Sequence, residues 1–146
     1  MILSTKGRYG LKIMYELALN YGEGPMPLKE VAQRQQLSET YLEQLIAHLK
    51  KAGLVRSIRG AQGGYELIRK PEEISVGEII RTLEGPLAPS ECVVDAEPEC
   101  TKAENCVTRL IWEKIMEGIN NVVDSITLND MVNDYYKLKR KKEGEK

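Results

Sequence analysis

The chain has 146 residues, of which 42% are apolar and 29% are charged, with a formal net charge of −1. This length suits one compact domain, or a small domain with a dimerisation helix. No apolar run approaches the length that crosses a bilayer, and the beginning, MILSTKGRYG, lacks the apolar core of a signal peptide. The composition therefore predicts a cytoplasmic protein with no membrane partner.

Charge is segregated along the chain. Residues 1–70 carry 11 Lys/Arg and 6 Asp/Glu, residues 71–136 carry 4 and 14, and residues 137–146 carry 6 and 2. A basic beginning, an acidic middle and a basic end are typical of a protein that binds a polyanion through one face. An ordinary distribution of surface charge is the alternative interpretation.

The first expected helix begins at a cap on Ser4 or Thr5 and runs to about Asn20. Its first turns are rich in basic and polar side chains. Because backbone N–H groups at the start of a helix attract phosphate, three of these side chains are candidate DNA contacts. They are Ser4, Lys6 and Tyr9. A solvated basic turn is the alternative.

Residues 27–53 have the pattern of two short helices joined by a tight turn. Pro27 suits the first position of the first helix, Ser38 can cap the second, and Gly53 can end it. In a helix-turn-helix motif the second helix enters the major groove by its N-terminal residues. The candidate DNA contacts here are Ser38, Glu39, Tyr41 and Glu43. A helical hairpin with no DNA role is the alternative.

Two short strands, 54–58 and 65–68, flank the glycine-rich tip RGAQGG. Glycines permit close approach to a groove, and Arg59 and Gln62 are the tip side chains expected to contact DNA. The tip opens a strand and not a helix, so the Rossmann and P-loop contexts both fail. A capping box at Ser75 and Glu78 predicts a further helix over 76–84. Residues 1–85 are therefore expected to form a winged helix-turn-helix domain.

The segment 86–106 holds all three cysteines of the chain, Cys92, Cys100 and Cys106. Clustered thiols in a cytosolic chain favour a metal centre over a disulfide. The spacing lacks the CxxC knuckle of common zinc sites, whereas thiolates in a loop can hold an iron–sulfur cluster. A [2Fe–2S] cluster needs four protein ligands, of which three are cysteines here. A reversible thiol sensor and three incidental thiols are the alternatives.

A long helix is expected from Val107, and residues 107–136 are expected to form a dimerisation unit that ends in a short helix over 128–136. Apolar side chains recur on the long helix at heptad spacing: Trp112, Ile115, Ile119, Val122 and Ile126. Pairing with the same helix of a second subunit predicts a two-fold homodimer, and a purely intramolecular core is the alternative. Residues 137–146 are expected to be a basic, disordered tail.

Several segments together resemble one family. STKGRYGLKIM, LSETYLEQLIAHLKKAGLV, RGAQGGYEL, VGEIIRTLEG, the three-cysteine loop and the IWEKI helix resemble the IscR-type regulators, winged-helix bacterial transcription factors of the Rrf2 family. The resemblance implies a homodimer with crossing long helices and a [2Fe–2S] cluster on Cys92, Cys100 and Cys106. It also implies that the dimer reads a double-stranded operator through Ser38, Tyr41, Glu43 and Arg59, with Glu43 as a selectivity element.

Two features depart from the IscR pattern. That pattern has a histidine three residues after the third cysteine, where this chain has Arg109, and the first cysteine gap is longer. The fourth ligand is left open between Asp95, Glu104, Asn105 and a group from elsewhere. Some relatives in the family lack the cysteines and regulate cysteine metabolism.

The expected fold is mainly helical with a small β-wing, and the expected function is that of a transcriptional regulator or repressor that senses an iron–sulfur cluster and controls cluster biogenesis or related genes. The alternatives are an iron–sulfur carrier, and a cluster-free regulator of thiol or cysteine metabolism with the same fold. An enzyme acting on a small-molecule substrate is disfavoured, because the sequence has no His–carboxylate cluster, no nucleophile motif and no phosphate loop in the right context.

Overall fold

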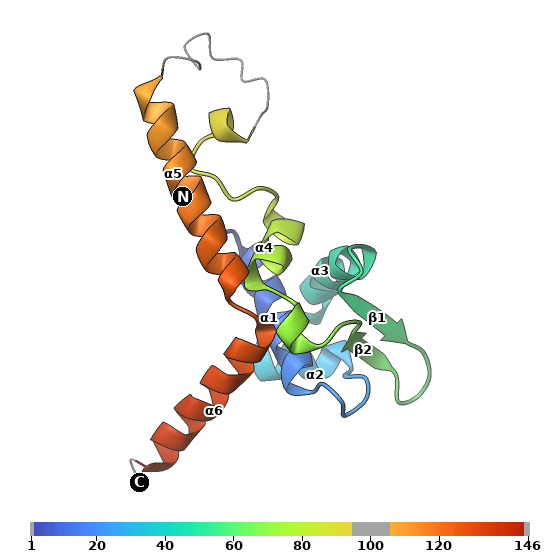
Figure 1. The fold of residues 1–146 in the computed structure, drawn as a ribbon. Coiled ribbons are helices and arrows are strands. Elements are labelled where there is room, and N and C mark those ends of the chain that lie inside the picture. The colour runs from blue at the N-terminus through green and yellow to red at the C-terminus, as the bar shows by residue number, and fades with distance from the viewer. Residues whose placement is uncertain (1, 95–105, 145–146) are drawn as a thin grey trace.

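The computed structural model describes residues 2–94 and 106–144 of the chain. Within these ranges the chain is mainly helical, with one two-stranded antiparallel sheet (Figure 1). The fold class expected from the sequence is therefore confirmed. The elements are, in chain order, α1 (Thr5–Leu19), α2 (Leu28–Gln35), α3 (Glu39–Lys51), β1 (Val55–Ile58), β2 (Gly64–Leu67), η1 (Pro71–Glu73), α4 (Val76–Glu84), η2 (Glu91–Val93), α5 (Val107–Ser125) and α6 (Leu128–Gly144).

Serine caps set where three of the helices begin. The hydroxyl oxygens of Ser4, Ser38 and Ser75 accept hydrogen bonds from backbone N–H groups two or three residues further on, at 3.2, 3.4 and 3.1 Å. These bonds satisfy donors that the first turn of a helix leaves without a partner. Gln36, which follows α2, has a left-handed φ of 56°, and Gly53 after α3 has a φ of 79°.

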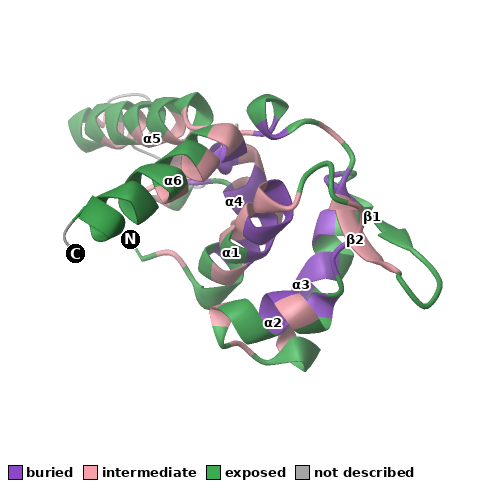
Figure 2. Ribbon diagram, turned by 90° about the horizontal axis from the view of Figure 1, so that it is seen from below, coloured by how far each residue is buried: buried purple, intermediate pink, exposed green. Residues whose placement is uncertain are grey.

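The main core lies between α1, α2, α3 and α4, where the buried side chains gather (Figure 2). Helices α1 and α4 approach closely because α1 carries glycine at the contact. A Cβ built on Gly10 would lie 1.9 Å from Cδ1 of Leu83. The two helices therefore pack with no room for a side chain at that point.

The wing is anchored to the segment that precedes α2. Strands β1 and β2 pair in a register that sets Val55 opposite Leu67. On the other side of β2, the backbones of Met26 and Tyr65 exchange two hydrogen bonds, each of 2.9 Å. A Cβ on Gly64 would lie 2.4 Å from the carbonyl of Met26, so glycine permits this approach.

The connection between α5 and α6 is fixed to the start of α4. The Val76 N–H donates to the Ile126 carbonyl at 2.8 Å, and the Leu128 N–H donates to the Ile74 carbonyl at 3.0 Å. From this point α5 and α6 run away from the domain in different directions (Figure 1). Neither these helices nor any other described helix is long and apolar enough to span a membrane.

The expectation of a disordered tail is wrong over Lys137–Gly144, which continues α6. This segment holds four Lys, one Arg and one Leu, all of them good helix formers. The helix also starts on a capping box, because Thr127 and Asp130 exchange bonds of 2.9 and 3.1 Å between side chain and backbone. The final residues 145–146 lie outside the described part.

Candidate nucleic-acid interface

Helix α3 has one buried face and one polar face. Leu42, Leu45, Ile46 and Leu49 pack into the core, as their spacing predicts. The candidate contacts Ser38, Glu39 and Glu43 are exposed at its start, and Tyr41 is half-buried. The polar face at the beginning of α3 is therefore free to meet a groove.

The half-buried Tyr41 joins the starts of α1 and α3. Its hydroxyl lies 2.9 Å from the hydroxyl of Thr5, and its ring meets that of Tyr9 edge-on, with centroids 5.8 Å apart. Tyr9 of α1 and Tyr41 of α3, both candidate DNA contacts, therefore lie side by side. Thr5, which the sequence indicated only as a possible helix cap, belongs with Tyr9 and Tyr41 at this contact.

Basic side chains surround the Tyr9 ring. The guanidinium carbon of Arg8 lies 6.0 Å from the ring centroid, and Nζ of Lys12 lies 5.4 Å from it. Lys6 is exposed one turn earlier. The positive charge expected near the start of α1 is therefore present beside Tyr9, whose ring contacts that of Tyr41.

The backbone at the start of α1 is already engaged by a carboxylate. Oε1 of Glu84 accepts a hydrogen bond from the Ser4 hydroxyl and another, of 3.0 Å, from the Gly7 N–H. The hydrogen bond from Ser4, followed by that from Gly7, lowers the pKa of Glu84. The Ser4 hydroxyl can therefore donate to a phosphate only if it releases Glu84. No short-range pattern in the sequence indicated this contact between Ser4 and Glu84.

The wing tip lies on the same side of the domain as α3, away from α5 and α6 (Figures 1 and 2). Arg59 and Gln62 are both exposed on this tip. Gly60 has a φ of 115°, a conformation that favours glycine. Arg59 and Gln62 are therefore placed on the side of the domain on which a DNA duplex would lie along α3.

The two cysteines that the structure describes flank the segment 95–105. Cys92 lies in η2, and Cys106 precedes the first turn of α5. A hydrogen bond with the Thr108 hydroxyl, at 3.0 Å, lowers the pKa of the Cys106 thiol, and a bond from the Arg109 backbone adds to this effect. Cys100 and the ligand candidates Asp95, Glu104 and Asn105 lie outside the described residues.

The side chains available as metal ligands match the IscR pattern only in part, because the three cysteines are present and the histidine is not. Within residues 2–94 and 106–144, no three His, Cys, Asp or Glu side chains lie together as metal ligands. A thiol with a lowered pKa is suited to bind iron as thiolate. Arg109 stands at the position of the IscR histidine, and its Nε lies 3.7 Å from Glu113. A guanidinium has no acceptor and cannot replace the histidine as a ligand.

The structure divides the expected dimerisation seam between two surfaces. Ile119 and Ile126, together with Val123, pack on the small cluster formed by Val76, Ile80 and Leu87 in the same chain. Trp112 is half-buried, whereas Ile115 and Val122 are exposed. The exposed apolar side chains of α5, which we call the α5 stripe, are Val107, Leu110, Ile111, Ile115 and Val122.

The Rrf2 family model, described as an iron-dependent transcriptional regulator, matches residues 3–134. The transcriptional regulator CymR of Bacillus subtilis is 52% identical over 131 residues, which cover 90% of this chain and 89% of CymR. IscR of Aliivibrio salmonicida is 39% identical and covers 92% of this chain, with 79% of IscR covered.

Solved structures of two such regulators have the same fold. The structure described as CymR, the global cysteine regulator of B. subtilis, matches with a TM-score of 0.76 and 48% identity, over 91% of this chain and 97% of that one. The structure of T. potens IscR also matches with a TM-score of 0.76, at 52% identity over 92% and 88% of the two chains. The helix-turn-helix, the wing and these matches together show that the chain belongs to the Rrf2 family of DNA-binding transcriptional regulators.

Proposed function

We propose that the chain acts as a homodimer that binds a two-fold operator and controls genes of cysteine or thiol metabolism. The α5 stripe is the observation that supports the dimer. Exposed fractions along it run from 39% at Ile115 to 72% at Val107. Several large apolar side chains exposed along one helix are typical of an interaction site. Pairing of two α5 helices about a two-fold axis would bury the stripe in both copies.

A dimer of this kind suits a palindromic operator. Each subunit presents one α3 and one wing on the side of its domain away from α5. Two recognition helices related by a two-fold axis can enter two half-sites separated by about one helical turn of DNA, roughly 34 Å. The geometry of the single chain thus supports reading of paired half-sites.

Two observations support cysteine or thiol metabolism as the regulated process. CymR, whose structure is described as that of a global cysteine regulator, is similar to the chain over nearly the full length of both proteins. In addition, Arg109 occupies the position of the IscR histidine ligand. A regulator of thiol metabolism does not require that ligand.

A cluster-sensing regulator is the second candidate, and the Cys106 thiol favours it. Its lowered pKa increases the thiolate form that binds iron, and T. potens IscR is as similar to the chain as CymR is. Cys92 and Cys106, with Cys100 from outside the described residues, would hold a [2Fe–2S] cluster. When bound, the cluster would supply a redox-active centre.

Anaerobic purification and operator binding distinguish the two candidates. Absorption in the visible range, iron and sulfide would be measured on the wild-type protein and on Cys92→Ala, before and after anaerobic reconstitution. Operator affinity would be measured on the same samples. The thiol-metabolism proposal expects tight operator binding by the iron-free protein and no change in Cys92→Ala. Equal amounts of iron and sulfide, lost in Cys92→Ala together with operator selectivity, would instead establish the cluster sensor.

The dimer is tested separately by sedimentation equilibrium. Val122→Asp would place a charge in the α5 stripe, and we expect it to yield a folded monomer with weak operator binding. Asn133→Asp adds the same charge to an exposed position of α6 and serves as the control. A Val122→Asp protein that stays dimeric would show that α5 is not the dimer interface.

A further inference from the structure

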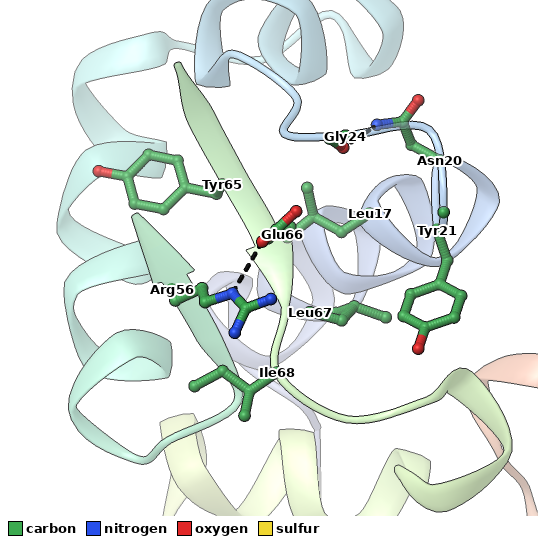
Figure 3. Close-up of a pocket in the computed structure, with 10 residues that line it drawn as sticks. Leu17, Asn20, Tyr21, Gly24, Arg56, Tyr65, Glu66, Leu67 and Ile68 are labelled. Atoms are coloured by element: carbon green, nitrogen blue, oxygen red, sulfur yellow. Dashed lines mark hydrogen bonds and ion pairs between the residues drawn. The ribbon is translucent and has the colours of Figure 1, made fainter. Parts of the chain in front are cut away.

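A cavity of about 310 Å³ lies at the base of the wing, and its lining includes neither Cys92 nor Cys106 nor any residue of α3 (Figure 3). Its walls come from the end of α1, the turn over residues 20–24, and the two wing strands. Small-molecule sites in proteins commonly measure about 300–1,000 Å³, so this cavity suits a ligand at the small end of that range.

Two opposite charges stand side by side in the wall of this cavity. Nε of Arg56 donates to Oε1 of Glu66 at 2.7 Å, and Figure 3 shows the two side chains turned toward one another across the sheet. Among the described residues, neither the terminal nitrogens of Arg56 nor Oε2 of Glu66 has a hydrogen-bond partner. The pair therefore retains donors for an anion and an acceptor for a cation.

The remaining walls provide an apolar floor and an open rim. Leu17 and Leu67 line the cavity and are each 3% exposed. Gly22 and Gly24 also line the cavity, and a Cβ added at either of them would meet no atom within 4 Å. The Asn20 amide donates to the Gly24 carbonyl at 2.9 Å and holds this turn in shape.

We propose that this cavity binds a free α-amino acid with a short side chain. Its carboxylate would bind the terminal nitrogens of Arg56, its ammonium group would bind Oε2 of Glu66, and its side chain would lie toward Leu17 and Leu67. A simple anion would be repelled by Glu66 and a simple cation by Arg56, whereas a zwitterion satisfies both groups. This inference goes beyond the proposed function, because it concerns a ligand site that does not depend on which genes are regulated.

The alternative is that the ion pair only ties the two strands together. Arg56 and Glu66 are directly opposite in the register of β1 and β2, and ion pairs of this type at a surface contribute little to stability. A purely structural pair requires no ligand. It predicts that substitution of either residue alters no binding equilibrium with an amino acid.

Isothermal titration calorimetry on the full chain decides between these possibilities. The probes are glycine, L-alanine, L-serine, L-valine and, under reducing conditions, L-cysteine. For the best probe, analogues that lack one charge are then measured. If the probe is L-valine, the analogues are isobutylamine, which lacks the carboxylate, and 3-methylbutanoate, which lacks the ammonium group. We expect saturable binding of at least one amino acid and none of either analogue.

Variants locate the site. Arg56→Gln and Glu66→Gln should each weaken binding by about ten- to hundredfold, since each removes a charged hydrogen-bond partner. Arg140→Gln, the same change at an exposed position of α6 away from the cavity, should leave binding unchanged. Unfolding curves would show that each variant is folded. The absence of binding by all five amino acids, or unaltered affinity in both Arg56→Gln and Glu66→Gln, would overturn the proposal. Operator binding, measured in parallel, tests the proposed function independently.

Discussion

The hydroxyl groups of Thr5 and Tyr41 lie 2.9 Å apart and join the first turn of α1 to the first turn of α3. Tyr41 is also in contact with the ring of Tyr9. The orientation of the recognition helix therefore depends on a helix that precedes the helix-turn-helix motif, and side chains that never touch a base can influence how the operator is read.

Removing the Thr5 hydroxyl and removing the Tyr41 hydroxyl should have different effects, although both changes break the same hydrogen bond. Thr5→Val should destabilise the fold by about 1 kcal/mol, the usual net value of one hydrogen bond. Tyr41→Phe should cost a similar amount and, in addition, weaken operator binding if the phenol contacts a phosphate. Urea unfolding and fluorescence anisotropy would measure the two effects. The double variant provides the control, because loss of a single shared bond should not be additive. Fully additive losses of stability would show that the two hydroxyls do not interact.

Arg59 at the wing tip should contribute to operator affinity and not to stability. Arg59→Ala is expected to weaken operator binding by about 1–3 kcal/mol if the side chain enters a groove. If it contacts only phosphate, the variant should instead reduce the salt dependence of binding by about one unit of slope. Arg140→Ala on α6 removes the same charge far from the wing and serves as the control. Binding by Arg59→Ala that matches the wild type at every salt concentration would exclude a wing contact at this residue.

Gly10 should be intolerant of even the smallest side chain. Gly10→Ala places a methyl group against Cδ1 of Leu83, so α1 and α4 must separate, and we expect a loss of about 1–3 kcal/mol in the free energy of unfolding. The effect should be smaller in a Leu83→Ala background, where the opposing side chain is short. Thermal and urea unfolding of the four proteins would measure this coupling. An equal cost of Gly10→Ala in both backgrounds would point to a cause other than the contact with Leu83.

Glu84 should contribute to stability in a pH-dependent way. Its pKa is lower in the folded chain, mainly because the Ser4 hydroxyl donates to it. The ionised carboxylate therefore stabilises the fold above the unfolded pKa of about 4.3, and this contribution is lost as the pH falls through the lower folded pKa. Glu84→Gln should be less stable than the wild type at pH near 7, and the difference should diminish in acid. Urea midpoints across this range would measure it. A difference that stays constant with pH would show that ionisation of Glu84 is not involved.

Local signals in the sequence were sufficient to predict most of the helices. Ser38 and Ser75 act as caps in the structure as their positions indicated, because a cap requires only residues within one turn. The helix over 76–84 and the buried stripe of α3 also follow from short-range periodicity. The glycine-rich tip between two short strands was likewise sufficient to predict the wing.

Contacts between distant segments could not be predicted in this way. Glu84 meets Gly7 across 77 positions of sequence, and no periodic pattern encodes that approach. The heptad pattern of α5 indicated one apolar seam, but it did not distinguish Ile119, which packs on its own domain, from Ile115, which is exposed. Both surfaces of α5 are apolar, so only the placement of α4 separates them. The roles of Cys92 and Cys106 as ligands remain a prediction.

Helix α5 is held to α4 near its C-terminal end, by the bonds at residues 126–128 and by the packing of Ile119 and Val123 on Val76 and Ile80. The helix has 19 residues, so its far end at Cys106 lies about 28 Å from the anchored end at a rise of about 1.5 Å per residue. A tilt of about 5° at the anchor would move that far end by about 2.5 Å, as follows from the same length. A displacement of that size at Cys106 therefore corresponds to only a small rotation of α5 against α4. Glu84 at the end of α4 contacts the start of α1, so α4 connects α5 with the helix that carries Tyr9.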